Sequence, residues 1–152
     1  MKSPSVSVID GISSNYFDFK YKHRIFKVCD LLTAGVPLEK WASFVEDTSV
    51  VVFVIDSSCI PPEDQLLEEV LKLVKDTEKA KQYQDFSVLM VLTKADQAGV
   101  SPIDIVILKI LASKVALRTK REVRFITTNS CDKSRFERVY STCIDLCRNK
   151  LS

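Results

Sequence analysis

The 152-residue sequence lacks several features that would assign it to a specialised class of protein. It has no apolar run of about eighteen residues, the length that a membrane-spanning helix needs. Its 22 basic residues nearly balance its 20 acidic ones, and a net charge of +2 leaves no electrostatic footprint for DNA or RNA. Its 5 cysteines show no CxxC spacing, which argues against a zinc site or a disulfide framework. We therefore predict one globular domain without a transmembrane segment or a nucleic-acid partner.

Glycine is scarce as well, and only Gly11, Gly35 and Gly99 occur. The phosphate-binding motif GxxxxGK[ST], which needs two glycines in one loop, is absent from these 152 residues. Most of the cysteines are predicted to be small buried residues in a reducing compartment.

The apolar residues follow two periods, one typical of strands and one typical of helices. Two alternating runs around a turn near Lys22 and His23 predict an antiparallel hairpin. Alternation of strands and helices further along predicts an α/β fold with three layers, a mostly parallel sheet and helices on both faces. The expected strands are 5–9, 16–21, 24–29, 49–56, 86–92 and 122–128, and the expected helices are 38–46, 61–82, a segment opening at 101–102, and 134–151.

Polar residues follow the predicted strand 86–92, at the strand end where parallel sheets bind ligands. Residues 93–96 read Thr-Lys-Ala-Asp. This run resembles the guanine-specificity motif [N/T]KxD of Ras-like GTPases. The resemblance implies that Asp96 accepts hydrogen bonds from the N1–H and 2-amino groups of guanine. It also implies that the stem of Lys94 lies along the base and that Thr93 ties the loop to its neighbours. The alternative is a polar turn that only ends a strand.

A second polar loop follows the predicted strand 122–128. In the same family this loop donates a backbone N–H to the O6 atom of guanine. The resemblance implies that Thr128, Asn129 and Ser130 form this loop, with Ser130 as the donor. Ser and Thr are also common in loops that have no ligand.

Spacing over a longer stretch narrows the resemblance to the Arf/Sar branch of small GTPases, and the chain is similar too to the β-subunit of the signal-recognition-particle receptor. The resemblance covers about residues 9–151 and implies a single Ras-like domain over residues 1–152, built like a P-loop NTPase fold that is truncated at its N-terminus. The residues whose spacing matches that of Arf proteins are Tyr21, Lys22, Phe26, Asp30, Trp41, Thr48 and the run Phe53-Val54-Ile55-Asp56-Ser57.

The chain departs from the family at its switch motifs. Asp30 matches the Asp of DxxGQ and would contact Mg²⁺ indirectly, whereas Thr33 replaces the Gly and Ala34 replaces the Gln that orients water. Gly11 stands where the family has its magnesium-binding Thr. Because phosphoryl transfer depends on positioning and charge stabilisation, the loss of these parts and of the phosphate loop predicts no catalytic residue and no metal site beyond the indirect contact of Asp30.

The missing family segment includes a strand that lies between the strands here ending at Asp30 and Asp56. Its absence would leave two unpaired edges within the sheet. Three arrangements would satisfy these edges: residues 5–9 occupy the empty position, the flanking strands pair directly, or a partner chain or a longer parent sequence supplies the strand. The sequence leaves these three alternatives open.

Three functions are compatible with these features of the sequence. The first is a degenerate Arf/Sar-like domain that acts through protein partners, with weak binding of GTP or GDP and Mg²⁺ at most. The second is a genuine GTPase of trafficking or protein targeting whose phosphate loop is missing from this chain. The third is an unrelated doubly wound domain. The resemblance implies a cytoplasmic protein, with peripheral association at the cytosolic face of a membrane as an option.

Overall fold

The computed structural model describes residues 5–9, 12–21, 23–32, 48–80, 85–97, 99–129, 131 and 133–148. The chain divides into two compact units. The first unit comprises Met1–Asp47 and Asp76–Tyr83, and the second comprises Thr48–Lys75 and Gln84–Ser152. The expected helix 38–46, with Trp41, lies outside the described residues.

The first unit contains an antiparallel sheet of three strands in the order β1-β2-β3. The predicted hairpin is confirmed, because β2 pairs with β3 from Tyr21 opposite Arg24 onward. His23, in the turn, has a φ of 64°, and two-residue hairpin turns need this left-handed conformation. The strands are β1 (Ser5–Ile9), β2 (Ile12–Tyr21) and β3 (Arg24–Leu32).

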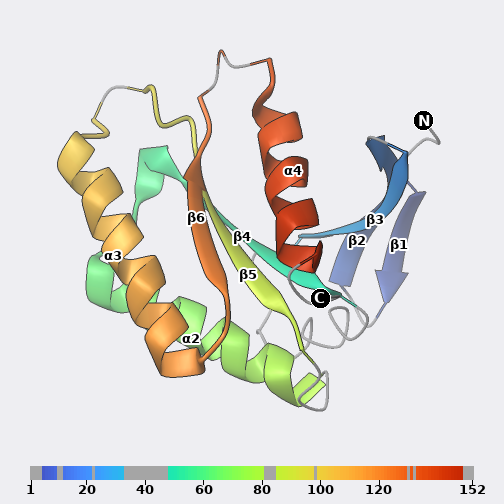
Figure 1. Ribbon diagram of the computed structural model, residues 1–152, viewed down its shortest axis with the longest axis horizontal. Coiled ribbons are helices and arrows are strands. Elements are labelled where there is room, and N and C mark those ends of the chain that lie inside the picture. Colours follow the sequence, from blue (N-terminus) through green and yellow to red (C-terminus); the bar gives the residue numbers. More distant parts are fainter. Residues whose placement is uncertain are drawn as a thin grey trace. The chain divides into compact units, whose positions relative to one another are not determined.

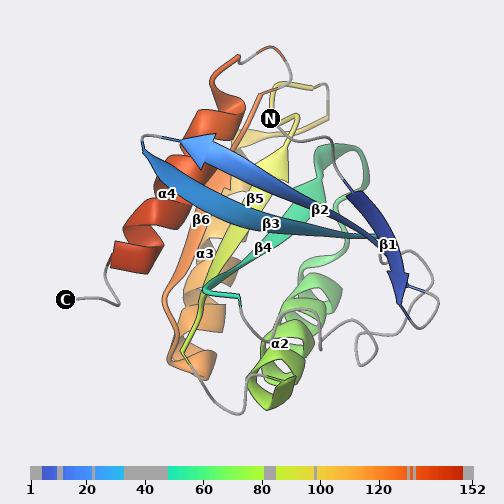
Figure 2. The same cartoon turned by 90° about the vertical axis from the view of Figure 1, so that its right-hand side faces the viewer.

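The second unit contains a parallel sheet in the order β4-β5-β6, with helices on both faces. Helix α4 lies on one face, and α2 and α3 lie on the other (Figures 1 and 2). A coarse α/β architecture is thus observed. Its elements are β4 (Val50–Asp56), the short 3₁₀ helix η2 (Ser57–Cys59), α2 (Glu63–Ala80), β5 (Ser87–Thr93), α3 (Pro102–Thr119), β6 (Val123–Thr127) and α4 (Arg135–Arg148).

The central strand β5 organises the core of the second unit. Residues 87–92 are all buried, as expected for a strand covered on both faces. Leu89 and Val91 pack with Cys143 and Leu146 of α4. The alternate side chains of β5 project to the opposite face, where α2 and α3 supply further buried residues. These are Leu66, Leu67, Val70, Leu73 and Val74 of α2, and Leu108, Leu111, Ala112 and Val115 of α3.

Two sheets replace the single mixed sheet that the sequence led us to expect. Among the described strands, β3 ends one sheet and β4 ends the other, so these two do not pair. The segment 5–9 does not pair with either of them, because Ser5–Ile9 pairs with β2. Only residues 10 and 11 separate β1 from β2, so antiparallel pairing between chain neighbours requires the least loop-closure entropy.

The burial predictions need two smaller corrections. Helical spacing of the apolar residues in the expected helix 61–82 predicts a buried stripe that includes Leu71, but Leu73 is buried and Leu71 is only half-buried. Among the five cysteines, only Cys143 is buried, and Cys59 and Cys131 are exposed. Both exposed cysteines lie in connections beyond strand ends, where the sheet and the helices provide no cover.

Candidate functional site

The loops that follow β5 and β6 are joined to each other by their backbones. The N–H of Ala95 donates to the carbonyl of Thr128 over 2.9 Å, and the N–H of Thr128 donates to the carbonyl of Leu92 over 2.9 Å. Thr128 is 4% exposed. These bonds continue the parallel pairing of β5 and β6 past the strand ends. The two sequence-predicted loops are therefore adjacent at the carboxyl end of the sheet.

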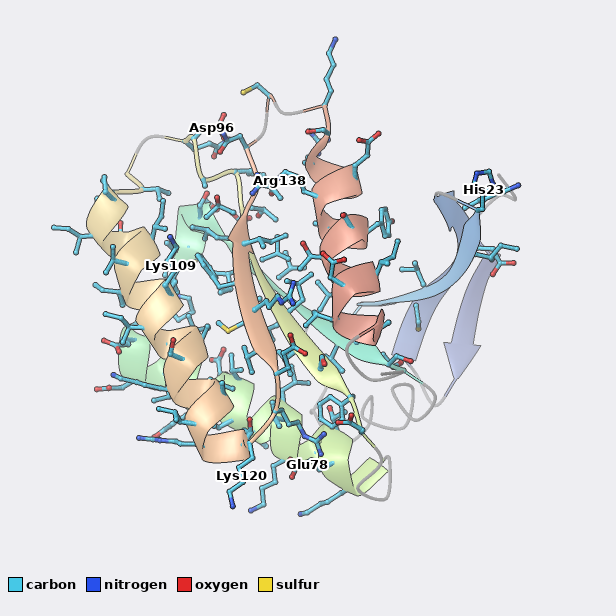
Figure 3. All side chains as sticks on the ribbon, in the orientation of Figure 1. His23, Glu78, Asp96, Lys109, Lys120 and Arg138 are labelled. Carbon is cyan, nitrogen blue, oxygen red and sulfur yellow. The ribbon has the colours of Figure 1, made fainter. Side chains whose placement is uncertain are left out.

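Asp96 lies at the exposed tip of the first loop, where Figure 3 labels its side chain. Asp96 lies within a four-residue turn, because the N–H of Gln97 donates to the carbonyl of Lys94 over 3.0 Å. The Cys131 thiol, from the second loop, donates to Asp96 Oδ2 over 3.6 Å. The carboxylate thus faces the loop after β6. Asn129 is exposed beside Thr128, and Ser130 lies outside the described residues.

Thr93 and Ser57 link the first loop to the end of β4. Thr93 Oγ1 donates to the carbonyl of Ile55 over 3.3 Å. Ser57 Oγ donates to the carbonyl of Lys94 over 2.8 Å. The loop is therefore held on both sides, by β4 and by the loop after β6, so the position of Asp96 is set by three strand ends.

Lys94 has a φ of 54°, a left-handed conformation that is uncommon for a residue with a side chain. Its ammonium group lies 3.7 Å from Asp56 Oδ2 at the end of β4. Both side chains are about half exposed, so this ion pair contributes little to stability. The Lys94 side chain thus extends toward Asp56.

Asp56 is anchored by Ser58, which the sequence reading did not identify as part of the site. The backbone N–H and the hydroxyl of Ser58 both donate to Asp56 Oδ1, over 2.9 Å and 2.8 Å. These two bonds are the main reason that the pKa of Asp56 lies below its ordinary value, and the charge of Lys94 adds a smaller effect. An Asp followed two residues later by Ser after a strand is the local pattern of such a turn, and it could have been recognised.

The residues of the degenerate switch are only partly described. Asp30 lies on β3, opposite Asn15 on β2. Thr33, Ala34 and Gly11 lie outside the described residues. Asp30 also belongs to the first unit, whereas the two loops belong to the second.

A cleft of about 390 Å³ lies between η2, the start of α2 and the first turns of α3. Ser57, Gly99 and Asp104 line it together with apolar side chains of α2 and α3. Asp96 and Thr128 are not among its lining residues. Asp96 therefore lies outside this cleft, at an exposed loop tip.

The exposed carboxylate of Asp96 can accept two parallel N–H donors from one edge of a planar ligand. In the part of the chain that the structure describes, no group of three or more His, Cys, Asp or Glu side chains could hold a metal ion. Within the same residues, no helix combines the length and the apolar character that crossing a bilayer requires. Comparison with models of known protein families and with curated proteins gives no match for this chain.

Proposed function

We propose that this chain is a degenerate small-GTPase domain of the Arf/Sar type, which acts mainly through protein partners and binds guanine weakly at most. The observation that carries the proposal is the hydrogen-bonded contact between the loop of Asp96 and the loop of Thr128. It supports the proposal because recognition of a guanine edge needs a carboxylate and a nearby backbone donor from two different loops.

The geometry fits a nucleobase better than a complete nucleotide. Asp96 would accept from N1–H and the 2-amino group, and the loop at 128–130 would donate to O6. Two hydrogen bonds to a charged group contribute roughly 3–6 kcal/mol before the cost of immobilising the ligand. Once an association cost of at least about 4 kcal/mol is subtracted, little net binding energy remains, so we expect a dissociation constant that is millimolar or weaker. The described residues include no lysine-containing glycine loop that would hold phosphates and raise this affinity.

The sheet topology is compatible with the finer fold, a Ras-like fold that is truncated at its N-terminus. In that fold one central strand separates the strands that correspond to β3 and β4. Here those two strands end separate sheets. We propose a protein partner as the main ligand and, from the resemblance, a cytoplasmic location that includes the cytosolic face of membranes.

A second candidate function is a genuine GTPase of trafficking or targeting, with a phosphate loop supplied by sequence outside these 152 residues. One observation favours it. Among the described strands, β4 pairs only with β5, so its other edge has hydrogen-bonding groups that a further strand could use. GTP and Mg²⁺ would then bind through that additional segment.

The test compares guanosine and adenosine monophosphates as ligands, with Mg²⁺–GTP in a separate titration. Binding is followed by amide chemical shifts and by the fluorescence of Trp41, the only tryptophan. We expect millimolar binding of the guanine nucleotide, with shifts in the loops at 93–97 and 128–131. Asp96→Asn should remove the preference for guanine, because an amide cannot accept both donors. Asp145→Asn, at an exposed position of α4, is the matched control and should keep it.

The outcomes separate the three functions. Micromolar binding of Mg²⁺–GTP by this chain would contradict the degenerate domain. Micromolar binding that appears only when the additional segment is attached would favour the genuine GTPase. A guanine preference that survives Asp96→Asn would contradict the base site. The absence of any shift at millimolar guanosine monophosphate would favour an unrelated doubly wound domain.

A further inference from the structure

Helix α3 is apolar on two opposite sides, although only one of them is buried. Leu108, Leu111, Ala112 and Val115 face the core. On the other side, Ile103 is 70% exposed, Val106 is 52%, Ile110 is 49% and Leu117 is 81%. A helix that is apolar all round is typically covered on all sides, so this exposed face differs from that of an ordinary surface helix.

The exposed apolar residues of α3 form a narrow seam. Ile103, Val106, Ile110 and Leu117 follow the alternating spacing of three and four residues that the a and d positions of a heptad require, and Ser113 completes the pattern. The seam is therefore one side chain wide and runs along most of the helix. Such a seam matches the ridge of a second helix packed alongside, whereas a membrane surface binds a broader apolar face.

Basic side chains flank this seam on both sides. Lys109 lies at the position before Ile110 on one flank, and Lys114 lies on the other flank; both are exposed (Figure 3 labels Lys109). Lys114 also contacts Glu63 of α2 over 2.8 Å, so Lys109 is the cation on which the argument mainly depends. The only acidic residue of α3, Asp104, bonds Ser101 at the start of the helix.

The charges decide against a second copy of this chain as the partner. An antiparallel pair of α3 helices would place Lys109 opposite Lys109, and a parallel pair would place Lys109 opposite Lys114. Either arrangement brings like charges together along the seam. A helix with acidic residues at the flanking positions would instead complement both the apolar and the basic side chains.

We propose that the α3 seam (Ile103, Val106, Ile110, Leu117) is the docking site for an amphipathic helix of a partner protein whose apolar stripe is flanked by Asp and Glu. None of these residues belongs to the loops of Asp96 and Thr128. The proposal is therefore independent of the guanine site, and nucleotide titration does not test it.

The experiment measures binding of two labelled peptides to the full chain by fluorescence anisotropy. Both peptides are three-heptad helices with Leu at a and d, one with Glu and the other with Lys at e and g. We expect the Glu peptide to bind at least tenfold more tightly. Ile110→Gln should weaken that binding at least tenfold. Ile25→Gln is the matched control, because Ile25 is a similarly exposed isoleucine on β3, 69% exposed, and should leave binding unchanged.

Charge reversal gives a second, independent variant. Lys109→Glu should reduce the preference for the Glu peptide at least tenfold, while Lys133→Glu, an exposed lysine before α4, should not change it. Far-ultraviolet circular dichroism checks that each variant is folded. If Ile110→Gln does not fold, the Lys109→Glu comparison decides the matter.

Several results would overturn the proposal. One is equal binding of the two peptides, or no binding of either peptide at protein concentrations up to about 1 mM. Another is co-sedimentation with phosphatidylserine vesicles that Ile110→Gln abolishes, which would assign the seam to a lipid surface. A third is a concentration-dependent dimer in sedimentation equilibrium that Ile110→Gln dissociates, which would assign it to a second copy.

Discussion

Cys143 illustrates how burial controls the chemistry of a single residue. Its side chain packs between Leu89 and Val91 of β5 and Leu146 of α4. Burial, with a smaller effect of Cys147, raises the pKa of the Cys143 thiol from 9.0 to about 12. Because the folded pKa lies above the unfolded one, the folded state binds the proton more strongly. The contribution of the Cys143 thiol to the stability of the folded state is fully present below pH 9 and is lost as the pH rises toward 12.

Alkylation should therefore distinguish the cysteines by position. At pH 8, iodoacetamide should modify the exposed Cys59 and Cys131 of the folded chain, whereas Cys143 should react only after unfolding. Peptide mass spectrometry after timed quenching measures each site, and a sample denatured in guanidinium is the control. Modification of Cys143 as fast as that of Cys131 in the folded protein would contradict its burial.

At the same scale, the sequence predicted that polar loops follow β5 and β6, but it did not predict how the side chains of these loops are oriented. The run 93–96 could be found because an apolar strand precedes it, and Ala95 and Thr128 do bond across the two loops. The contact of Lys94 with Asp56 could not be predicted from the sequence. It depends on a left-handed backbone at Lys94, and lysine has no preference for that conformation.

At the scale of an element, helix α3 shows which features the sequence predicts and which it does not. Its start was predicted correctly at Ser101 and Pro102, because a hydroxyl before a proline is a strong start pattern. Its buried face was not predictable. Apolar residues occur on both sides, so periodicity alone did not distinguish the buried Leu108 from the exposed Ile110. Packing of the helix against the sheet determines which of the two sides is buried.

The capping box of α3 gives a prediction about stability. Ser101 Oγ accepts from the N–H of Asp104 over 3.2 Å, and Asp104 Oδ2 accepts from the N–H of Ser101 over 2.9 Å. Ser101→Ala should lower the free energy of unfolding by about 1 kcal/mol. Ser113→Ala is the control, since Ser113 Oγ bonds only the carbonyl of Lys109 within the same helix, and it should change stability by less than about 0.5 kcal/mol. Urea unfolding followed by circular dichroism measures both, and equal losses would contradict the cap.

For the whole molecule, the core can be followed through the buried hydrophobic residues of the described part, which lie in the second unit. These buried hydrophobic residues run from Val51 to Leu146, and all of them belong to that unit. The sequence predicted the strands of both units but not the separation into two sheets. Pairing between strands is a long-range property, and a strand such as 5–9 is compatible with more than one neighbour.

We expect the second unit, which is compact, to fold without the first. A fragment that comprises residues 48–152 is expected to unfold in urea in one cooperative transition, because it contains β4, β5, β6 and the three described helices of the chain. Leu89→Ala in this fragment should cost about 2–5 kcal/mol, since Leu89 is completely buried in the central strand. Lys133→Ala, at an exposed position, should cost less than about 0.5 kcal/mol. A fragment without a cooperative transition would show that its core needs residues 1–47.

The contrast between the antiparallel hairpin and the parallel sheet has a consequence for the rate of folding. Strands β2 and β3 meet across one tight turn, so their pairing is a local event on the microsecond scale. Val50 pairs with Ser87, and Val88 with Val123, only after a whole helical crossover has closed each time. Formation of the parallel sheet is slow, because these long segments lose conformational entropy before their strands gain any contact. The parallel sheet, and not the hairpin, therefore sets the time that the chain needs to reach its native state.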